Sequence, residues 1–412
     1  MGRGKIPRET VELAKKILET GPLCRFCLGS LTAEAEPRAM EEWTKGAALL
    51  EILGKGSGRE CIICGGVIEE RLERATRDLL ASLSEYEFDT FKAGSRIPGW
   101  IAERADEVRS ALGVDTAKGL KVVTSRYVDR VVSEGLGKTI DPEQADLRAL
   151  VDLGSGRISV EVKPVLVAGR YRKLVRGIWQ SRKPCPNCGG RGCPECGWRG
   201  VDVRSSVETL IGEVMKRFFE AEDYRLHAAG REDYDARMLG SGRPFVIELV
   251  RPKVRRVSLR EVERTVNEEA GGAVEVSGLR YADWELVEIL KSGATETRKV
   301  YRAVVEVEGE VTPSELSELK RALSGAIVEQ RTPTRVLRRR ADLLRKRRVY
   351  SVETRLLGPR SFEMIVECDG GLYIKELVSG DDGRTRPSVS SILGKKAFCR
   401  ELDVLEVKTP HL

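Results

Sequence analysis

The sequence predicts an α/β protein, in the broad α+β sense, that is divided into several domains. Residues 8–20 and 67–84 carry apolar side chains at helical spacing, whereas residues 297–308 alternate with the period of two that is typical of a strand. The chain has 412 residues, which is enough for two or three domains that each bury a core. Eight of the 10 cysteines stand in C-x-x-C pairs, and such pairs predict bound metal rather than disulfides.

The composition argues against several classes of protein and favours a polyanionic partner. No hydrophobic run approaches the length of a membrane span, and residues 1–6 do not resemble a signal peptide, so we expect a cytoplasmic protein. The 71 basic residues outnumber the 64 acidic ones and gather in runs, as expected of a protein that binds nucleic acid. Two histidines, His227 and His411, are too few for a His-based hydrolase or a His-rich metal centre.

The first cysteine set predicts a zinc module at residues 1–73. Two C-x-x-C pairs, separated by a helical pattern at 38–53, can close a tetrahedral Cys₄ site. The glycines behind the second pair would let backbone amides approach the sulfurs. A redox pair is the alternative, but no thioredoxin-like βαβ context surrounds either pair. The expected ligands are Cys24, Cys27, Cys61 and Cys64.

A second zinc knuckle is predicted at residues 181–200, where it would link two domains. Glycines follow each C-x-x-C pair, at positions where the chain must turn tightly around sulfur. The closeness of the four cysteines favours one Cys₄ site over pairing with the first set. Basic residues surround the knuckle, so RNA contact is one possible role. The alternative is that the knuckle only joins two domains, and we favour this second interpretation. The expected ligands are Cys185, Cys188, Cys193 and Cys196.

Residues 74–180 are expected to form an RNA-binding domain. Helical patterns at 100–112 and 123–136 are flanked by strand patterns, the last of them at 157–167. This α/β block resembles a THUMP domain, a module that recurs in tRNA-modifying enzymes and helps to hold the acceptor end of tRNA. The block closes on cations around an aromatic residue, which suits phosphate contact with stacking, although a solvated edge is the alternative. The residues proposed for this contact are Arg170, Arg172 and Lys173.

The stretch Gly230–Phe245, G-R-E-D-Y-D-A-R-M-L-G-S-G-R-P-F, is the candidate catalytic segment. Its density of opposed charge is unusual for a segment that builds a fold, because buried charges are costly unless they are paired. Asp233 and Asp235 fit the description of carboxylates kept ionised by neighbouring guanidinium groups. The arginines expected in that role are Arg231, Arg237 and Arg243. A plain surface loop is the alternative.

This stretch resembles the active-site signature of pseudouridine synthases. Its first four residues, G-R-E-D, are similar to the G-R-x-D motif, whose aspartate is the one residue that their chemistry requires. The continuation A-R-M-L-G and G-R-P-F resembles the tenth family of archaeal and eukaryal tRNA pseudouridine synthases, Pus-ten. The resemblance implies that Asp233 is catalytic and that Arg231 lies at the substrate.

Further motifs carry the resemblance through residues 201–412, the expected catalytic domain. K-V-Y-R-A at 299–303 resembles the second signature, whose tyrosine packs on the target base; the strand pattern alone would make Tyr301 a core residue. Y-I-K at 373–375 resembles the Y-I-R/K signature, in which the aliphatic residue packs beside the base and the cation pairs with the aspartate. The resemblance therefore assigns these roles to Ile374 and Lys375. Leu393, or its neighbour Ile392, stands where a pocket leucine is expected.

Residues 331–348, called here the basic segment, contain nine cations and the single acidic residue Asp342. So many cations exceed what one solvated face needs, and phosphate binding is the simpler interpretation. Enzymes that the chain resembles carry such a segment on a mobile loop that pinches the RNA. The RNA-binding residues expected here are Arg338, Arg339, Arg340 and Arg347.

Taken together, the resemblance implies an isomerase that converts uridine to pseudouridine in the T-arm of tRNA, at positions 54 and 55. It implies a catalytic domain on a mixed, largely antiparallel sheet, no catalytic cofactor, structural Zn²⁺, and a tRNA partner for a monomeric protein. A THUMP-bearing methyltransferase or thiolase is one alternative, but the G-S-G stretches at Gly154 and Gly240 lack the strand–loop–helix context of a nucleotide site. A non-catalytic zinc RNA-binding adaptor is the other, and it leaves the ordered motifs unexplained.

Overall fold

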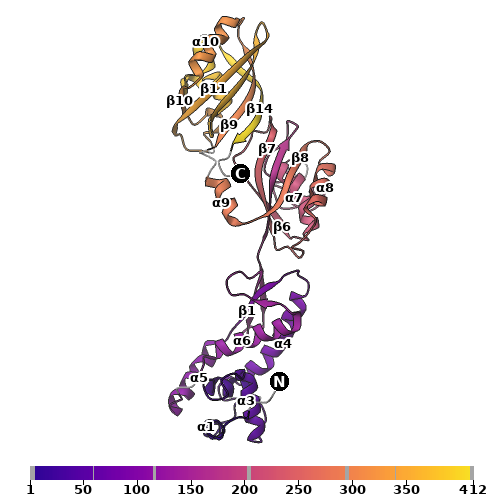
Figure 1. Cartoon of the computed structure of the whole chain (residues 1–412), viewed down its shortest axis with the longest axis vertical. Coiled ribbons are helices and arrows are strands. Elements are labelled where there is room, and N and C mark those ends of the chain that lie inside the picture. Colours follow the sequence, from indigo (N-terminus) through magenta and orange to yellow (C-terminus); the bar gives the residue numbers. More distant parts are fainter. Residues whose placement is uncertain are drawn as a thin grey trace. The chain divides into compact units, whose positions relative to one another are not determined.

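The computed structural model describes residues 5–58, 60–114, 117–201, 206–292, 297–338 and 340–408. The chain forms two compact units, Met1–Lys163 and Pro164–Leu412 (Figure 1). None of the described helices is both long enough and apolar enough to cross a membrane.

The first unit combines helices with a four-stranded sheet. Its helices are α1 (Arg8–Leu18), α2 (Arg25–Leu31), α3 (Glu42–Ile52), α4 (Val67–Leu83), α5 (Gly99–Leu112) and α6 (Leu120–Leu136). Its strands are β1 (Thr90–Arg96), β2 (Thr139–Ile140), β3 (Leu147–Asp152) and β4 (Ile158–Val162). They are ordered β2-β1-β3-β4, with β1 parallel to both neighbours and β3 antiparallel to β4.

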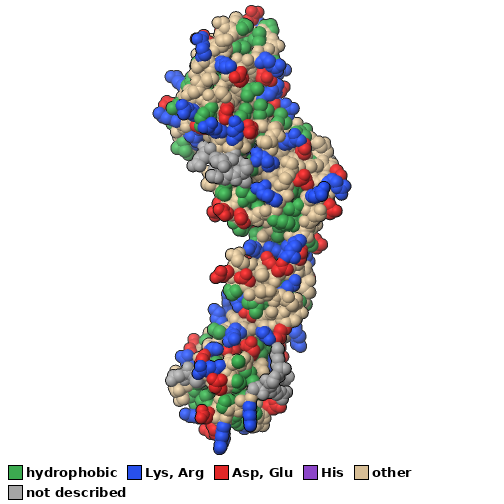
Figure 2. Space-filling model, in the orientation of Figure 1, with side chains coloured by type: hydrophobic (Ala, Val, Ile, Leu, Met, Phe, Trp, Pro, Cys, Tyr) green, Lys and Arg blue, Asp and Glu red, His purple; other side chains and the backbone are tan. Residues whose placement is uncertain are grey.

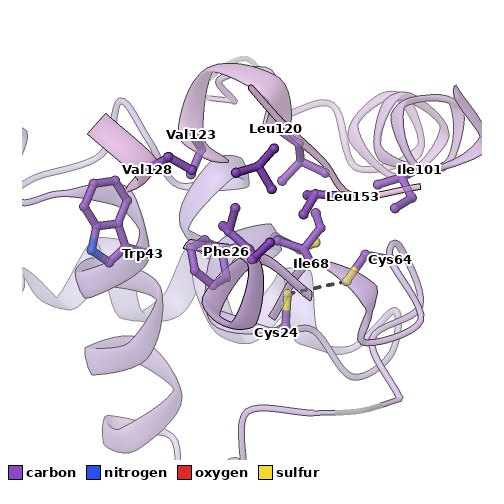
Figure 3. Packing of buried hydrophobic residues seen from close by; sticks show 14 of the residues in the cluster. Cys24, Phe26, Trp43, Cys64, Ile68, Ile101, Leu120, Val123, Val128 and Leu153 are labelled. Carbon is purple, nitrogen blue, oxygen red and sulfur yellow. Dashed lines mark hydrogen bonds between the residues drawn. The ribbon is translucent and has the colours of Figure 1, made fainter. Parts of the chain in front are cut away.

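One continuous hydrophobic core fills the first unit. Figure 3 shows Cys24 and Cys64 beside Phe26 and Ile68, and the same core includes Leu79 of α4. The domain boundary that the sequence predicts at residue 73 therefore falls inside α4, a helix that packs on both sides of that boundary. The reason is size: a module of about 70 residues buries little apolar surface on its own, and here it shares the core of its neighbour.

The second unit is built on a ten-stranded sheet. Its strands are β5 (Val165–Lys173), β6 (Asp223–Ala228), β7 (Ala236–Val250), β8 (Val274–Ala282), β9 (Arg298–Val307), β10 (Ile327–Arg331), β11 (Leu344–Gly358), β12 (Ser361–Asp369), β13 (Thr385–Arg386) and β14 (Ala397–Lys408). They are ordered β13-β10-β11-β12-β9-β14-β7-β5-β8, and β6 pairs with β7. Among these described pairs only β7 and β14 run parallel, which confirms the mixed, largely antiparallel sheet.

Helices of the second unit cover the two halves of this sheet separately. Helices α7 (Val207–Phe218), α8 (Leu259–Glu269) and α9 (Trp284–Ser292) pack with β5–β8, and α10 (Pro313–Leu323) packs with the other half (Figure 1). Helices α11 (Ile374–Ser379) and α12 (Val389–Leu393) also pack with that other half. Each half therefore has its own hydrophobic core. Tyr301 of β9 contacts both cores, so it stands where the two halves meet.

Strand β5 belongs to this second sheet, between β7 and β8. The sequence instead groups residues 164–180 with the THUMP-like domain and merges 157–167 into one strand. Pro164 separates β4 from β5, because a proline lacks the N–H that a strand ladder requires. The alternation that continues through Val167 and Tyr171, both buried, is the signal that marks β5 as an interior strand of the larger sheet.

Candidate active site

The predicted catalytic segment, Gly230–Phe245, starts in the connection between β6 and β7 and continues into β7, at the parallel seam of the sheet. Ala236 begins β7 and pairs with Leu402 of β14, while β5 pairs with β7 from Met238 onward and β6 pairs with its far end. The backbone N–H of Ala236 donates to the carbonyl of Asp233, 3.1 Å away, and closes the turn. The two aspartates are thus held at a fixed point beside β9 and β14.

A pocket of about 370 Å³ opens at this seam. Most of the side chains that the sequence predicts for the site line it, although they come from four separate parts of the chain. These residues are Arg231, Asp233, Tyr301, Arg340, Arg347, Ile374 and Lys375. The pocket is richer in cations than in carboxylates, because Lys299, Arg335 and Arg345 also line it while Glu232 is the one further acid.

Two cations approach the carboxylate of Asp233. Arg335 places Nη2 3.2 Å from Oδ2, and Lys375 places Nζ 3.5 Å from the same oxygen. The side chain of Asp233 is 36% exposed, so it is open to a ligand while its charge is paired. Lys375 therefore lies where the family resemblance places the partner of the aspartate, and Arg335 is a partner that the sequence did not reveal.

Asp235 is held by the same lysine at shorter distances. Nζ of Lys375 lies 2.7 Å and 2.8 Å from the two carboxylate oxygens. Burial alone would raise the pKa of Asp235, but the hydrogen bond from Lys375 brings that pKa below its ordinary value. Asp235 is thus a partner of Lys375 and lies outside the pocket lining.

Among the described residues, none of the three arginines expected to hold the two aspartates contacts either carboxylate. Arg237 forms a two-pronged contact with Asp403, at 2.9 and 2.8 Å. Arg243 pairs with Glu232 at 2.9 Å, and Arg231 is exposed at the pocket. Sequence neighbours in a strand point to opposite faces, so closeness in sequence does not make these side chains neighbours in space.

The Glu232–Arg243 pair is the buried anchor of the catalytic segment. Arg243 is 1% exposed and Glu232 is 5% exposed. Tyr171 donates its hydroxyl hydrogen to Glu232 at 2.9 Å, and Gln180 donates to Tyr171 at 2.7 Å and to the carbonyl of Gly230 at 2.9 Å. This network satisfies a buried charge and fixes the residue next to Asp233. The sequence offered no signal for it beyond the charge density.

Tyr301 and Lys299 lie two residues apart on β9, so both face the pocket. Burial raises the pKa of Tyr301 well above its ordinary value, so the phenol stays neutral. Lys299 is 6% exposed, and burial together with the charge of Arg243 lowers its pKa to about 8. In the sequence, Lys299 is marked only as the first residue of the K-V-Y-R-A motif around the tyrosine.

Ile374 and Lys375 are the first residues of α11, directly after Tyr373. Gln330 of β10 accepts from the Tyr373 N–H at 2.8 Å and donates to its carbonyl at 3.0 Å. These two hydrogen bonds hold Tyr373, the residue directly before α11. Ile374, the first residue of the helix, lies buried in the pocket wall. Ile392 and Leu393 are the last residues of α12; they are half-buried against the core of their half of the sheet and do not line the pocket.

The basic segment brings some of its arginines to the pocket and not others. Arg340 donates to the Tyr373 hydroxyl at 3.1 Å, and Arg345 and Arg347 sit on one face of β11. Arg338 is exposed and does not line the pocket, and Arg339 lies outside the described residues. Of the described arginines in this segment that were expected to contact phosphate, Arg340 and Arg347 line the pocket. Arg345, which was not predicted, lines it as well.

The cations of β5 have different surroundings. Arg172 pairs with Glu275, and Arg170 donates to the carbonyls of Ser241 and Gly242. Lys173 is fully buried, and its ammonium donates to the carbonyls of Ile178, Asp233 and Tyr234. Lys173 thus supports the backbone of the catalytic segment and does not face solvent. It lies two residues after the buried Tyr171 on β5, so both side chains point to the same, interior face of the strand.

Both cysteine sets gather as the spacing predicts. The four thiols of each set, Cys24, Cys27, Cys61 and Cys64 in the first unit and Cys185, Cys188, Cys193 and Cys196 in the second, lie within 4.8 Å of one another. Sulfurs around a tetrahedral zinc at about 2.3 Å would be roughly 3.8 Å apart, and the separations from Cys24 to Cys64 and from Cys185 to Cys193 are 3.7 and 3.8 Å. Backbone amides of Gly192 and Gly200 donate to the sulfurs of Cys188 and Cys196. Both sets therefore fit a bound metal.

Comparison with known proteins decides the family. The model for the Pus10 C-terminal region matches residues 166–408. The chain belongs to the Pus10 family of pseudouridine synthases. The tRNA pseudouridine synthase Pus10 of Korarchaeum cryptofilum is 50% identical over 85% of this chain and 94% of its own length. That of Pyrococcus furiosus is 39% identical over 96% of this chain and 97% of its own length.

A second model, for the archaeal Pus10 THUMP domain, matches residues 76–152. This stretch runs from α4 through β3 in the first unit, so the THUMP resemblance is confirmed there. The Pus10 C-terminal match begins at β5, as does the second structural unit. The Pus10 fold and the family assignment drawn from the ordered motifs are thus both confirmed.

Proposed function

We propose that this protein isomerises uridine to pseudouridine in the T-arm of tRNA, at positions 54 and 55, through the carboxylate of Asp233. The pocket carries this proposal, because it brings Asp233, Tyr301, Ile374 and Lys375 together from distant parts of the chain. The names of the Pus10 relatives support tRNA as the substrate. The T-arm positions follow from the family resemblance in the sequence.

The reaction explains why the site needs these groups. The N1–C1′ bond breaks, the uracil turns, and C5 joins C1′; the proton on C5 is then lost and N1 gains one, so atoms balance without an external reagent. None of these atoms can be reached in stacked RNA, and the nucleotide must be flipped into the pocket. An ionised Asp233 beside Arg335 and Lys375 can act as the nucleophile at C1′ or as a base at the ribose.

The cations of the pocket would hold the RNA backbone around the flipped nucleotide. Arg340, Arg345 and Arg347 line the pocket, and among the described residues none of them has a carboxylate partner. On the face shown in Figure 2, acidic and basic side chains are interspersed, so attraction of RNA would depend on such local clusters. Tyr301 would stack on the uracil, and Ile374 would pack beside it.

Structural Zn²⁺ would be held by each Cys₄ set, none of whose cysteines lines the pocket of Asp233, and the reaction would need no cofactor. The protein would act as a monomer in the cytoplasm, with tRNA as its partner. Arg231 and Leu393 stay candidate substrate contacts, and Arg170, Arg172, Arg338 and Arg339 stay candidate RNA contacts.

A tritium-release assay tests this proposal. An unmodified tRNA transcript carrying [5-³H]uridine is incubated with the protein in the absence of any added cofactor, and released tritium is measured. We expect release from the wild-type transcript and progressive loss when the uridines at positions 54 and 55 are replaced by cytidine, singly and together. Release that ignores these replacements would contradict the T-arm assignment, and binding without release would favour a non-catalytic adaptor.

A further inference from the structure

The basic segment contributes one side chain directly to the Asp233 carboxylate. Arg335 approaches Oδ2 at 3.2 Å, closer than Lys375 at 3.5 Å. Lys375 makes its shorter contacts with Asp235 instead. Among the described residues Arg335 is therefore the nearest cation to Asp233, and it comes from the turn Thr334–Val336 rather than from α11.

A second carboxylate fixes the orientation of Arg335. Its Nε lies 2.7 Å from Oε1 of Glu376, and the side chain of Glu376 is only 7% exposed. A carboxylate that is so buried requires a partner, which keeps the guanidinium from swinging away. The planar guanidinium can serve Glu376 along one edge and Asp233 with its remaining N–H groups, whereas an ammonium is a single point of charge.

The turn that carries Arg335 is itself fastened to the site. The N–H of Thr334 donates to Asp381 at 3.0 Å, which holds the start of the turn. Four residues earlier, Gln330 clamps the backbone of Tyr373. The start of the basic segment is thus tied to the residues on both sides of α11.

Arg335 differs in this respect from its neighbour Arg338. Two carboxylates occupy the guanidinium of Arg335, whereas Arg338 is exposed and no carboxylate contact is found for it among the described residues. A guanidinium already held by two anions is a poor site for a phosphate. Arg335 is therefore suited to arranging the active site, and Arg338 is suited to contacting RNA.

We propose that Arg335, held by Glu376, is a positioning residue that orients the Asp233 carboxylate toward the bound nucleotide. This inference rests on the proposed function, in which Asp233 is the reacting group. It also gives the basic segment two roles, since Arg335 arranges the carboxylate while the arginines beyond it bind phosphates.

The test compares Arg335→Gln, Arg335→Lys and Glu376→Gln with the control Arg338→Gln from the same segment. Single-turnover rates with saturating enzyme report the chemical step, and filter binding across salt reports phosphate contacts. For Arg335→Gln we expect the rate to fall by about 100-fold, because a small misplacement of a reacting group has that effect, with affinity and salt dependence unchanged. Arg335→Lys should recover part of the rate. Arg338→Gln should mainly lower affinity and the salt slope, and it should lower the single-turnover rate far less than Arg335→Gln does.

Coupling between Arg335 and Glu376 provides a second readout that does not depend on one variant folding well. Glu376→Gln should lower the rate by several-fold, and adding it to Arg335→Gln should cause no further loss. A wild-type rate in both Arg335 variants, or a loss of salt slope in Arg335→Gln that matches Arg338→Gln, would overturn the inference. A wild-type protein that releases no tritium would instead overturn the proposed function, so the two failures are distinguishable.

Discussion

At the scale of single residues, Lys299 is a buried cation in the pocket wall. Its pKa is lowered to about 8 in the folded protein, from an ordinary value of 10.5, mainly by burial. Between these two values the unfolded chain binds more protons than the folded one, so the contribution of Lys299 to stability rises with pH. Below pH 8 the folded protein buries a charge, at a cost of about 3 kcal/mol.

Replacing Lys299 by Met should therefore stabilise the protein in a pH-dependent way. At pH 7 we expect the variant to be more stable than the wild type by up to about 3 kcal/mol, with the advantage shrinking as the pH approaches 10.5. Denaturant unfolding at a series of pH values measures the difference. The exposed control Lys396→Met should show no such trend, and a constant difference for Lys299→Met would contradict the prediction.

At the scale of elements, the connection from β6 to β7 depends on the buried Glu232–Arg243 pair. Removing one partner of such a pair leaves an uncompensated charge in the interior. Arg243→Met should thus lower the free energy of unfolding by about 3–5 kcal/mol and reduce activity, since Glu232 precedes Asp233. The double variant Glu232→Gln, Arg243→Met should be more stable than Arg243→Met alone, as measured by urea unfolding. Equal stability of the two would show that the charge is not the cause.

The basic segment should govern affinity. Each phosphate contact releases counterions, so Ala at Arg338, Arg339 and Arg340 together should flatten the slope of log K against log salt by up to about three units. Turnover at saturating tRNA should fall only modestly, because these side chains position the RNA and do not react. Filter binding across salt with single-turnover kinetics separates the two effects. Wild-type affinity with wild-type salt dependence would show that the segment is a solvated face.

Local sequence patterns predict the helices and strands well, but they do not predict which charged side chains pair with one another. Helical spacing predicts α4 and α6, and the alternation at 297–308 predicts β9, because the spacing of apolar residues within each element is visible in the local sequence. The ion-pair partners of Arg243 and Asp233 cannot be identified from such local patterns. Glu232 and Arg335 are brought to them by turns and by sheet register, which depend on the whole fold.

At the scale of the whole molecule, metal is expected to close both Cys₄ sets. Purified protein should contain about two zinc ions per chain, one for each set. Cys61→Ser should lower the thermal midpoint without altering the rate at the Asp233 pocket, because Cys61 lies in the core of the first unit. Metal analysis and calorimetry check this, with Cys399→Ser, outside both sets, as the control. A fully folded, metal-free preparation would contradict it.

Local sequence patterns also locate the domains along the chain, but they do not give the exact limits of the two units. The ordered motifs place the catalytic region in the second half of the chain, and the α/β pattern places a THUMP-like domain in the first half, where the THUMP family model matches residues 76–152. The limits of the two units are predicted less well. The alternation within β5 marks it as an interior strand, but the sheet to which it belongs is set by its pairing with β7 and β8, which depends on the whole fold. Strand partners are a property of topology, and topology is not encoded residue by residue.

The central claim is that Asp233 is the reacting carboxylate, and comparison with Asp235 tests it most directly. Both aspartates contact Lys375, but only Asp233 lines the pocket. Tritium release from tRNA should be abolished in Asp233→Asn, which removes the charge and keeps the shape, while filter binding shows tRNA affinity near that of the wild type. Asp235→Asn should retain most of the activity. Release that survives in Asp233→Asn and disappears in Asp235→Asn would contradict the account.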